Sequence, residues 1–284
     1  MMKYSQSFIN FKTISLVVAL FILIIVILSF MLIPTSAKDE KNITYPKQKA
    51  MKQAIDNTFD IDSSQVYERR VGSVESAHAK GVGQLSRREN GHYYTMTAFA
   101  IDQHTLITNQ HAITNHKEGR MYDMKQYHFE SSVTRSDEQT KRFKIEDYHL
   151  IPDSDIAILH TKETMKDDVP KIKLGSNDEV KAMQKTGQRI YIAGYPISQH
   201  NRLTQAKGYT VATFSNNGIL STIPTSVGYS GSPLINNKNH VVGIHAFGYP
   251  KDGNKLSQKL HSHHIKGGYL FTPEVKKAIQ KESR

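Results

Sequence analysis

The 284-residue sequence contains no cysteine and no tryptophan. Without cysteine the chain has no disulfide, no thiolate zinc site and no cysteine nucleophile. Glycine and proline are modest, at 17 and 9 residues, which excludes a low-complexity chain. With 38% hydrophobic and 22% charged residues, the composition is that of a globular protein and not of a disordered polyelectrolyte. The length suits one large domain or two small ones.

Positive charge is in excess, with 37 Lys and Arg against 26 Asp and Glu, which gives a formal net charge of +11. This balance favours contact with anionic surfaces. The basic residues are, however, scattered along the chain and interleaved with acidic ones. We therefore interpret them as a solvated basic surface and expect no nucleic-acid partner.

The beginning of the chain has the pattern of a targeting segment. Residues 14–33 are apolar apart from two serines, Lys3 and Lys12 precede them, and small residues end at Ala37. A basic start, an apolar run and small residues indicate a secretory signal peptide over residues 1–37. The run is also long enough to span a bilayer, so an uncleaved anchor is the alternative. In both cases we expect the rest of the chain outside the cytoplasm, and cleavage would make the protein secreted and extracellular.

Residues 38–62 are polar and carry mixed charges, and Pro46 breaks any long helix. Within them, Lys47 to Phe59 has the pattern of one short amphipathic helix. We interpret residues 38–62 as a propeptide, with a plain stalk as the alternative.

From Tyr93 onward, short β-rich runs alternate with turn residues. Many short strands at this spacing predict an all-β sandwich or barrel instead of alternating β/α units. The predicted strands are 94–101, 106–107, 143–150, 156–160, 189–193, 209–214, 241–245 and 268–271. One helix is expected at the carboxyl end, because Thr272 can cap it, Pro273 suits its first turn and Glu274 suits its positive end.

Three segments carry residues suited to nucleophilic catalysis. Each is a weak signal alone, but together they give the order His, Asp, Ser on the ends of predicted strands. The segments are Leu106-Ile107-Thr108-Asn109-Gln110-His111, Asp153-Ser154-Asp155-Ile156-Ala157-Ile158 and Gly228-Tyr229-Ser230-Gly231-Ser232-Pro233.

The chemistry explains these residue types. A Ser hydroxyl is a poor nucleophile at neutral pH, so an imidazole must take its proton, and a carboxylate must orient that imidazole. The oxyanion formed during attack on a carbonyl needs preorganised donors. The glycine before Ser230 lets the backbone N–H groups of Gly228 and Ser230 point to one spot.

These motifs resemble the glutamyl endopeptidases, secreted bacterial serine proteases to which the exfoliative toxins are related. The continuation Leu234-Ile235-Asn236-Asn237 through Val241-Val242-Gly243-Ile244-His245 extends the resemblance, as does Gly194-Tyr195-Pro196. It covers about residues 63–284 and implies a chymotrypsin-like fold of two six-stranded antiparallel β-barrels with a C-terminal helix. We expect the N-terminal barrel in residues 63–170, and the C-terminal barrel and terminal helix in residues 171–284.

The resemblance also assigns catalytic roles. It makes His111 the general base, Asp155 its orienting carboxylate and Ser230 the nucleophile. Asp153 is a competing carboxylate, and Asp155 is preferred because it directly precedes the strand at Ile156.

For specificity, the resemblance implies a pocket lined by Thr225 and His245, where a hydroxyl and an imidazole can bind a side-chain carboxylate. This implies cleavage after Glu and more weakly after Asp. Ala246, Phe247 and Gly248 resemble the segment that pairs with the substrate backbone. Exfoliative toxins tend to carry a Lys shortly after the pocket His; here Gly248 occupies that position, which favours general digestion over toxin-like selectivity.

The resemblance further implies a proenzyme. Glu68-Arg69 resembles a stretch just inside the mature start, which places cleavage near Asp62–Ser64, with Arg70 as a rival site. The freed α-amino group would then help to neutralise the substrate carboxylate. An activating protease would be a partner in that case.

No metal and no cofactor are expected. His261, His263 and His264 lie close together in sequence, but their spacing does not match that of a metal site. We interpret this segment as a solvated loop. We expect a monomer acting on protein and peptide substrates that contain Glu. The alternatives are a non-catalytic or highly selective, toxin-like protein on the same fold, or a membrane-tethered adhesin.

Overall fold

The computed structural model describes residues 43–71, 79–115, 118–131, 141–199 and 202–284. Every element below belongs to one compact unit, Glu40–Arg284. The expected signal peptide over residues 1–37 lies outside the described residues. Across the described ranges, no helix is both long enough and apolar enough to cross a membrane.

Six antiparallel strands close into a first barrel in the order β2-β3-β4-β9-β8-β7. Side chains alternate between the inside and the outside of the barrel: in β7, Tyr127, Phe129 and Ser131 are buried, and the two residues that alternate with them are half-buried. Leu85, Phe129 and Leu159 meet in its core. The strands are β2 (Val82–Glu89), β3 (His92–Ala100), β4 (Thr105–Thr108), β7 (Tyr127–Ser131), β8 (Arg142–Ile151) and β9 (Ile156–Thr161). A small hairpin, β5 (Thr114–Asn115) with β6 (Arg120–Met121), lies outside the barrel sheet.

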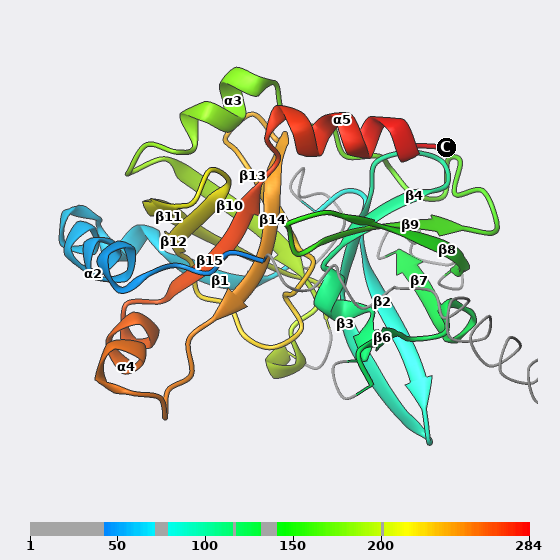
Figure 1. The fold of residues 1–284 in the computed structure, drawn as a ribbon, viewed down its shortest axis with the longest axis horizontal. Coiled ribbons are helices and arrows are strands. Elements are labelled where there is room, and N and C mark those ends of the chain that lie inside the picture. Colours follow the sequence, from blue (N-terminus) through cyan, green and yellow to red (C-terminus); the bar gives the residue numbers. More distant parts are fainter. Residues whose placement is uncertain (1–42, 72–78, 116–117, 132–140, 200–201) are drawn as a thin grey trace, which may run out of the picture. The chain divides into compact units, whose positions relative to one another are not determined.

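A second sheet has the order β1-β11-β10-β13-β14-β15-β12, and an additional β11–β12 pairing closes six of its strands into a barrel. Figure 1 shows the two barrels side by side. The predicted fold class of two six-stranded barrels is confirmed. The strands are β1 (Tyr67–Arg70), β10 (Arg189–Gly194), β11 (Thr204–Phe214), β12 (Gly218–Thr222), β13 (Pro233–Ile235), β14 (Val241–Gly248) and β15 (Ile265–Leu270).

The expected division at residue 63 differs from the strand pairing. β1, which the sequence places in the first barrel, pairs with β11 of the second. The reason is the unequal length of neighbouring strands: β12 covers β11 only over residues 209–214, which leaves the edge at residues 204–207 for β1.

The segment before β1 also packs on the second barrel. The helix expected between Lys47 and Phe59 is confirmed as α2 (Gln48–Asn57), with Ala54 and Ile55 buried. The side-chain amide of Asn57 donates to the carbonyl of Val211 in β11 at 2.6 Å. In Figure 1, α2 lies beside α4 (Lys255–Ser262) on the outer side of this barrel. Removal of residues 38–62 as a propeptide stays a prediction.

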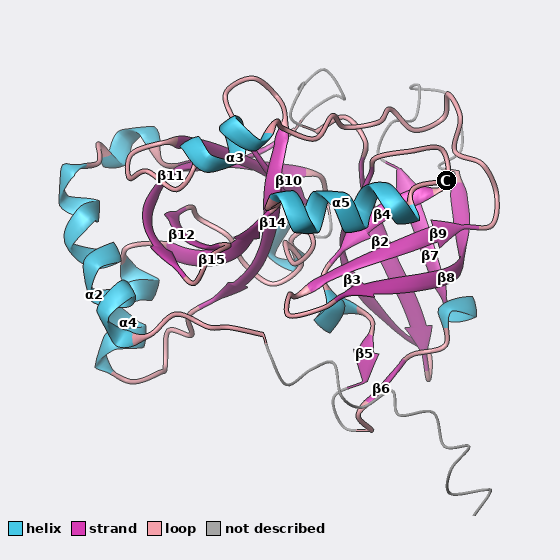
Figure 2. Cartoon of the chain, turned by 45° about the horizontal axis from the view of Figure 1, so that its top comes forward, coloured by secondary structure: helices cyan, strands magenta, loops and turns pink. Residues whose placement is uncertain are grey.

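At the carboxyl end, α5 (Pro273–Glu282) has the expected cap, because Thr272 accepts from the N–H of Val275 at 3.4 Å and Pro273 starts the helix. The helix leaves the second barrel and lies across to the first, as Figure 2 shows. There, the carbonyl of Glu282 contacts Nε2 of His160 at 2.7 Å. The backbone N–H of Arg284 donates to the hydroxyl of Thr105 in β4 at 2.9 Å.

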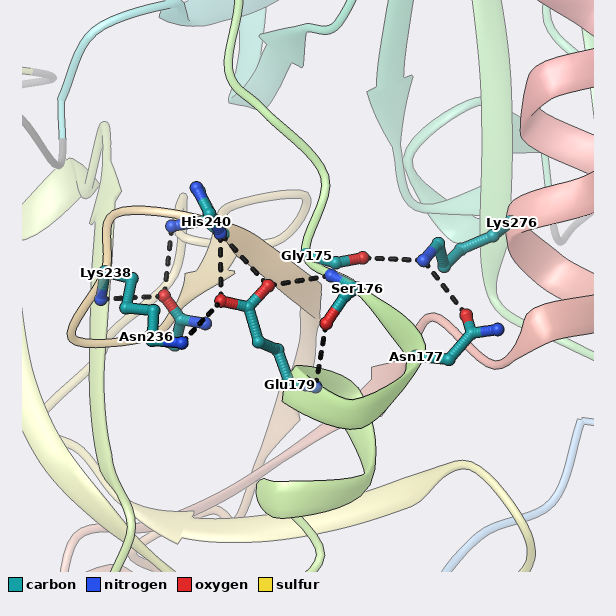
Figure 3. Close-up of polar contacts among 8 residues, drawn as sticks. All are labelled: Gly175, Ser176, Asn177, Glu179, Asn236, Lys238, His240 and Lys276. Atoms are coloured by element: carbon teal, nitrogen blue, oxygen red, sulfur yellow. Dashed lines mark hydrogen bonds and ion pairs between the residues drawn. The ribbon is translucent and has the colours of Figure 1, made fainter.

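A network of hydrogen bonds and ion pairs holds α3 (Asn177–Ala182) to the β13–β14 hairpin. Glu179 accepts from the backbone N–H of Ser176 at 2.7 Å and contacts Nδ1 of His240 at 3.0 Å, and its carboxylate lies 3.4 Å from Nζ of Lys238. Asn236 accepts from the backbone N–H groups of Lys238 and His240. Figure 3 shows these five residues, called here the Glu179 cluster, together with Lys276, which donates to the carbonyl of Gly175.

Candidate active site

His111 follows β4 directly. The strand ends at Thr108, Asn109 is extended, and the short 3-10 helix Gln110–Ala112 places the imidazole beside the next strand of the sheet. Burial of the neighbours fixes this turn, since Asn109 and Gln110 are almost completely buried while His111 is half-buried. The ring is therefore held at the barrel surface by a rigid backbone.

Asp155 directly precedes β9, the neighbour of β4 in the sheet. Its carboxylate accepts from the backbone N–H of His111 at 2.9 Å and meets Nδ1 of the same residue at 2.7 Å. The side-chain amide of Asn109 donates to the carbonyl of Asp155 at 2.9 Å, which holds the acid in place from the other side. Asp153, the rival carboxylate, is exposed and has a positive φ of 56° in the preceding turn.

The charge of Asp155 governs the titration of His111. Burial alone would lower the pKa of this imidazole, but the negative charge and hydrogen bond of Asp155 outweigh it and the pKa is raised above 6.5. Because Asp155 holds Nδ1, Nε2 is left to exchange a proton with a reacting group.

Ser230 lies in the loop between β12 and β13, in a turn that only glycine permits at two positions. Gly228 has φ of +106° and Gly231 has φ of +86°. A Cβ at Gly228 would lie 2.3 Å from the carbonyl oxygen of Tyr195, and one at Gly231 would lie 2.0 Å from that of Thr97. Both glycines are thus required by conformation and by space, and Ser230 stands half-buried between them.

Thr97 in β3 connects this turn to the histidine side of the site. Its hydroxyl donates to the carbonyl of Gly228 at 2.9 Å, and its backbone N–H donates to the carbonyl of Ser230 at 2.9 Å. Its own carbonyl accepts from the hydroxyl of Thr108 at 2.8 Å, three residues before His111. The first barrel therefore holds the Ser230 turn through one buried threonine, which the sequence pattern does not single out.

Two backbone N–H groups of the turn have no hydrogen-bond acceptor among the residues that the structure describes. Tyr229, Gly231 and Ser232 donate their N–H groups within the protein, to Ser226, His245 and Tyr229. The N–H groups of Gly228 and Ser230, the predicted oxyanion donors, make no such bond to any residue that the structure describes. Unpaired N–H groups beside a serine can stabilise a developing oxyanion.

The two residues expected to line the specificity pocket are in contact. Thr225 Oγ1 lies 3.3 Å from Nε2 of His245, although the two are 20 residues apart in sequence. The backbone of His245 bonds to the nucleophile turn, because its N–H donates to Ser232 at 2.9 Å and its carbonyl accepts from Gly231 at 3.2 Å. Thr225 and His245 therefore lie next to the Ser230 turn, and the specificity pocket expected there, called the recess below, stays a prediction.

Burial keeps His245 uncharged. The side chain is 4% exposed, and burial, together with the positive charges of Lys266 and His111, lowers its pKa to about 3. At neutral pH the ring is therefore a neutral imidazole, with one N–H to donate and no charge to offer an anion.

Ala246, Phe247 and Gly248 continue β14 past the reach of β13, whose register ends at Ile244. On the other edge, Phe247 and Gly248 pair with Gly267 and Lys266 of β15. No strand among the described residues pairs with the other edge of 246–248, and such an edge can take an added peptide strand.

The three histidines near the end of α4 do not share one centre. His261 contacts the carbonyl of Tyr249 at 2.9 Å, whereas His263 contacts the hydroxyl of Thr58 at 3.0 Å. Nothing among the described residues brings three ligating side chains together.

Comparison with known proteins places this site in a family. A trypsin-like peptidase domain matches residues 96–244, which include His111, Asp155 and Ser230. Among solved structures, a Glu endopeptidase in complex with MPD shares the fold, with a TM-score of 0.59 and 18% sequence identity. The match covers 75% of this chain and 95% of that one. Because the family match extends over more than half of the sequence, the chain belongs to the trypsin-like peptidase domain family.

Proposed function

We propose that this trypsin-like peptidase is a serine endopeptidase that cleaves peptide bonds after Glu and, more weakly, after Asp. The observation that carries the proposal is the hydrogen-bonded His111–Asp155 pair, linked through Thr97 to the glycine-flanked turn of Ser230. An imidazole, a carboxylate and a hydroxyl in this arrangement match the division of roles in acyl transfer.

In the proposed mechanism, Ser230 Oγ attacks the carbonyl carbon of the scissile bond while His111 Nε2 takes its proton. Asp155 stabilises the imidazolium, and the N–H groups of Gly228 and Ser230 bind the oxyanion. The C–N bond then breaks as His111 gives its proton to the leaving amine. Water, with His111 again as base, hydrolyses the acyl-enzyme and frees Ser230.

Specificity for Glu is supported by the contact between Thr225 and His245 beside the nucleophile turn. A hydroxyl and a neutral imidazole N–H are two donors for a carboxylate. The free edge of β14 at residues 246–248 would hold the substrate backbone as an added strand, with the side chain before the scissile bond directed to Thr225 and His245.

Export and processing complete the proposal. The sequence of residues 1–37 supports secretion, and the stretch near Asp62–Ser64 supports removal of a propeptide by an activating protease. The proposed secreted form is a monomer. Asp62 caps a short 3-10 helix there, accepting from the N–H of Ser64 at 2.9 Å. N-terminal sequencing of secreted material would identify the mature start.

The test is digestion of an unrelated protein, followed by mapping of the new termini. We expect cuts after Glu, and Ser230→Ala to lower the rate by about 10⁴-fold or more. A fluorophosphonate probe that labels the wild type and not the variant would identify Ser230 as the nucleophile. Cleavage by Ser230→Ala at the wild-type rate, or cuts unrelated to acidic residues, would contradict the proposal.

A further inference from the structure

Lys266 in β15 is a buried charged side chain without an acceptor. It is 5% exposed, and no hydrogen bond or ion pair from its ammonium reaches any residue among those the structure describes. Burial lowers its pKa, and no carboxylate counters this effect. The ammonium nitrogen itself is not among the fully buried polar atoms, so the stem of the lysine is buried while its charge stays accessible to a ligand beside Gly248.

The strand register directs Lys266 to the same face of the sheet as His245. His245 pairs with Gly268 and Gly248 pairs with Lys266, with an irregularity between them. Paired residues project to one face, and residues two apart on a strand share a face. Phe247 and Gly267 lie on the opposite face, where a Cβ at Gly267 would meet the Phe247 ring at 2.0 Å.

Gly248 provides the space for this lysine. A Cβ at Gly248 would lie 3.0 Å from Cδ and 3.2 Å from Nζ of Lys266, so the lysine side chain lies over this glycine. The ammonium is also close enough to His245 for its charge to help lower the pKa of that imidazole. Lys266 and His245 therefore share one face of the β14–β15 pair, and Thr225 contacts His245 beside the turn of Ser230.

The side-chain carboxylate of a bound substrate needs a positive charge beside Thr225 and His245. His245 is neutral at neutral pH, and Thr225 supplies only a hydroxyl, so these two donors leave the charge of a bound anion uncompensated. Desolvation of an unpaired carboxylate is costly, whereas an ion pair with a buried ammonium offsets the cost for both partners.

The geometry points to Lys266 as the residue that pairs with the side-chain carboxylate of the substrate and so sets the preference for acidic residues. This inference rests on the proposed cleavage after Glu and names the charge that the recess supplies for it. The sequence interval of 21 residues between His245 and Lys266 is bridged by the β14–β15 pairing. A shorter Asp side chain reaches less far toward the ammonium, so we expect slower cleavage after Asp than after Glu.

The experiment compares two peptides that differ only by Glu or Gln before the scissile bond. Lys266→Met removes the charge and keeps an unbranched side chain, and Lys251→Met removes one exposed charge as the matched control. For Lys266→Met we expect kcat/KM to fall about 10- to 100-fold with the Glu peptide, and to change less than about threefold with the Gln peptide. Lys251→Met should keep the wild-type ratio of the two rates.

Folding is checked by thermal unfolding and by fluorophosphonate labelling of Ser230, and Lys266→Gln serves as a second uncharged variant. Wild-type preference for Glu over Gln in both folded Lys266 variants would overturn the inference and leave the proposed function intact. No preference for Glu in the wild type would overturn the proposed function itself.

Discussion

In the Glu179 cluster a carboxylate is met by three donors, whereas the lysine on the same sheet face as His245 has a buried side chain with no acceptor among the described residues. Glu179 is also partly open to water, with 14% of its side chain exposed, yet it is fully paired. Lys266 is 5% exposed and unpaired. A charged side chain that is paired with other residues of the protein stabilises the fold. A charged side chain without such a partner is available to bind a ligand.

The two regions should therefore respond differently to substitution. Changes in the Glu179 cluster are expected to affect stability and to spare catalysis. Changes at the His111–Ser230 site and its recess are expected to affect catalysis, and the removal of an unpaired charge there should not destabilise the protein. The predictions below test this division.

The largest difference is expected for Asp155→Asn. An amide cannot stabilise the imidazolium of His111 and favours the wrong tautomer, so kcat should fall about 10⁴-fold. Glu179→Gln, the matched carboxylate-to-amide change in the other region, should leave kcat within about twofold. Steady-state rates with a Glu-containing peptide check both, and a comparable loss in the two variants would remove the distinction between the regions.

A smaller catalytic loss is expected for Thr97→Val, which keeps the shape of the side chain but removes the donor to Gly228. Without this bond the oxyanion donors are less well held, and kcat should fall about 10- to 100-fold with little change in KM. Thr97→Ser restores the hydroxyl and should recover most of the rate. A loss shared equally by Thr97→Ser would argue for packing instead of positioning.

Stability should change in opposite directions in the two regions. Lys266→Met removes an unpaired buried charge and should raise the free energy of unfolding by about 1 kcal/mol, while Glu179→Gln should lower it by about 1 kcal/mol at pH 7. The backbone N–H of Ser176 and the imidazole of His240 lower the pKa of Glu179 from 4.5 to about 2.

The stabilisation by Glu179 is therefore present above pH 4.5 and lost as the pH falls toward 2. Thermal unfolding of both variants at pH 7 and at lower pH measures these differences. An equal effect of Glu179→Gln at every pH would show that its charge is not responsible.

The smallest effect concerns pH. The pKa of His111 is raised above 6.5 because Asp155 outweighs burial, and the general base must be neutral. We expect kcat/KM to rise with pH and to reach half its maximum above pH 6.5. A midpoint below this value in the pH profile of the free enzyme would contradict the electrostatic control by Asp155.

Much of the fold follows from local patterns. Runs such as 143–150 and 189–193 lie within β8 and β10, and the capped helix after Thr272 is α5. β2 is not among the predicted strands, because its sequence VGQLSRRE has few β-branched or aromatic residues. β2 is extended because it pairs with β3 and β7, and this pairing cannot be predicted from the local sequence.

The site divides in the same manner. His111, Asp155 and Ser230 stand out because their chemistry is marked by short motifs. Thr97 does not, because its contact with Gly228 spans 131 residues and depends on how the two barrels meet. Lys266 is also hidden from sequence reasoning, because only the register of β14 and β15 brings this lysine over Gly248.

The two barrels exchange segments from opposite ends of the described chain. Residues 43–70 come before the first barrel but pack on the second, while α5 follows the second barrel and reaches the first. Each barrel is therefore fully covered only when the chain segment beyond the other barrel has packed on it. Contacts between residues so far apart in sequence slow folding, and we expect neither barrel to be stable without the other. For a peptidase the consequence is that the Ser230 turn, which Thr97 of the first barrel holds through Gly228, is complete only when both barrels have folded.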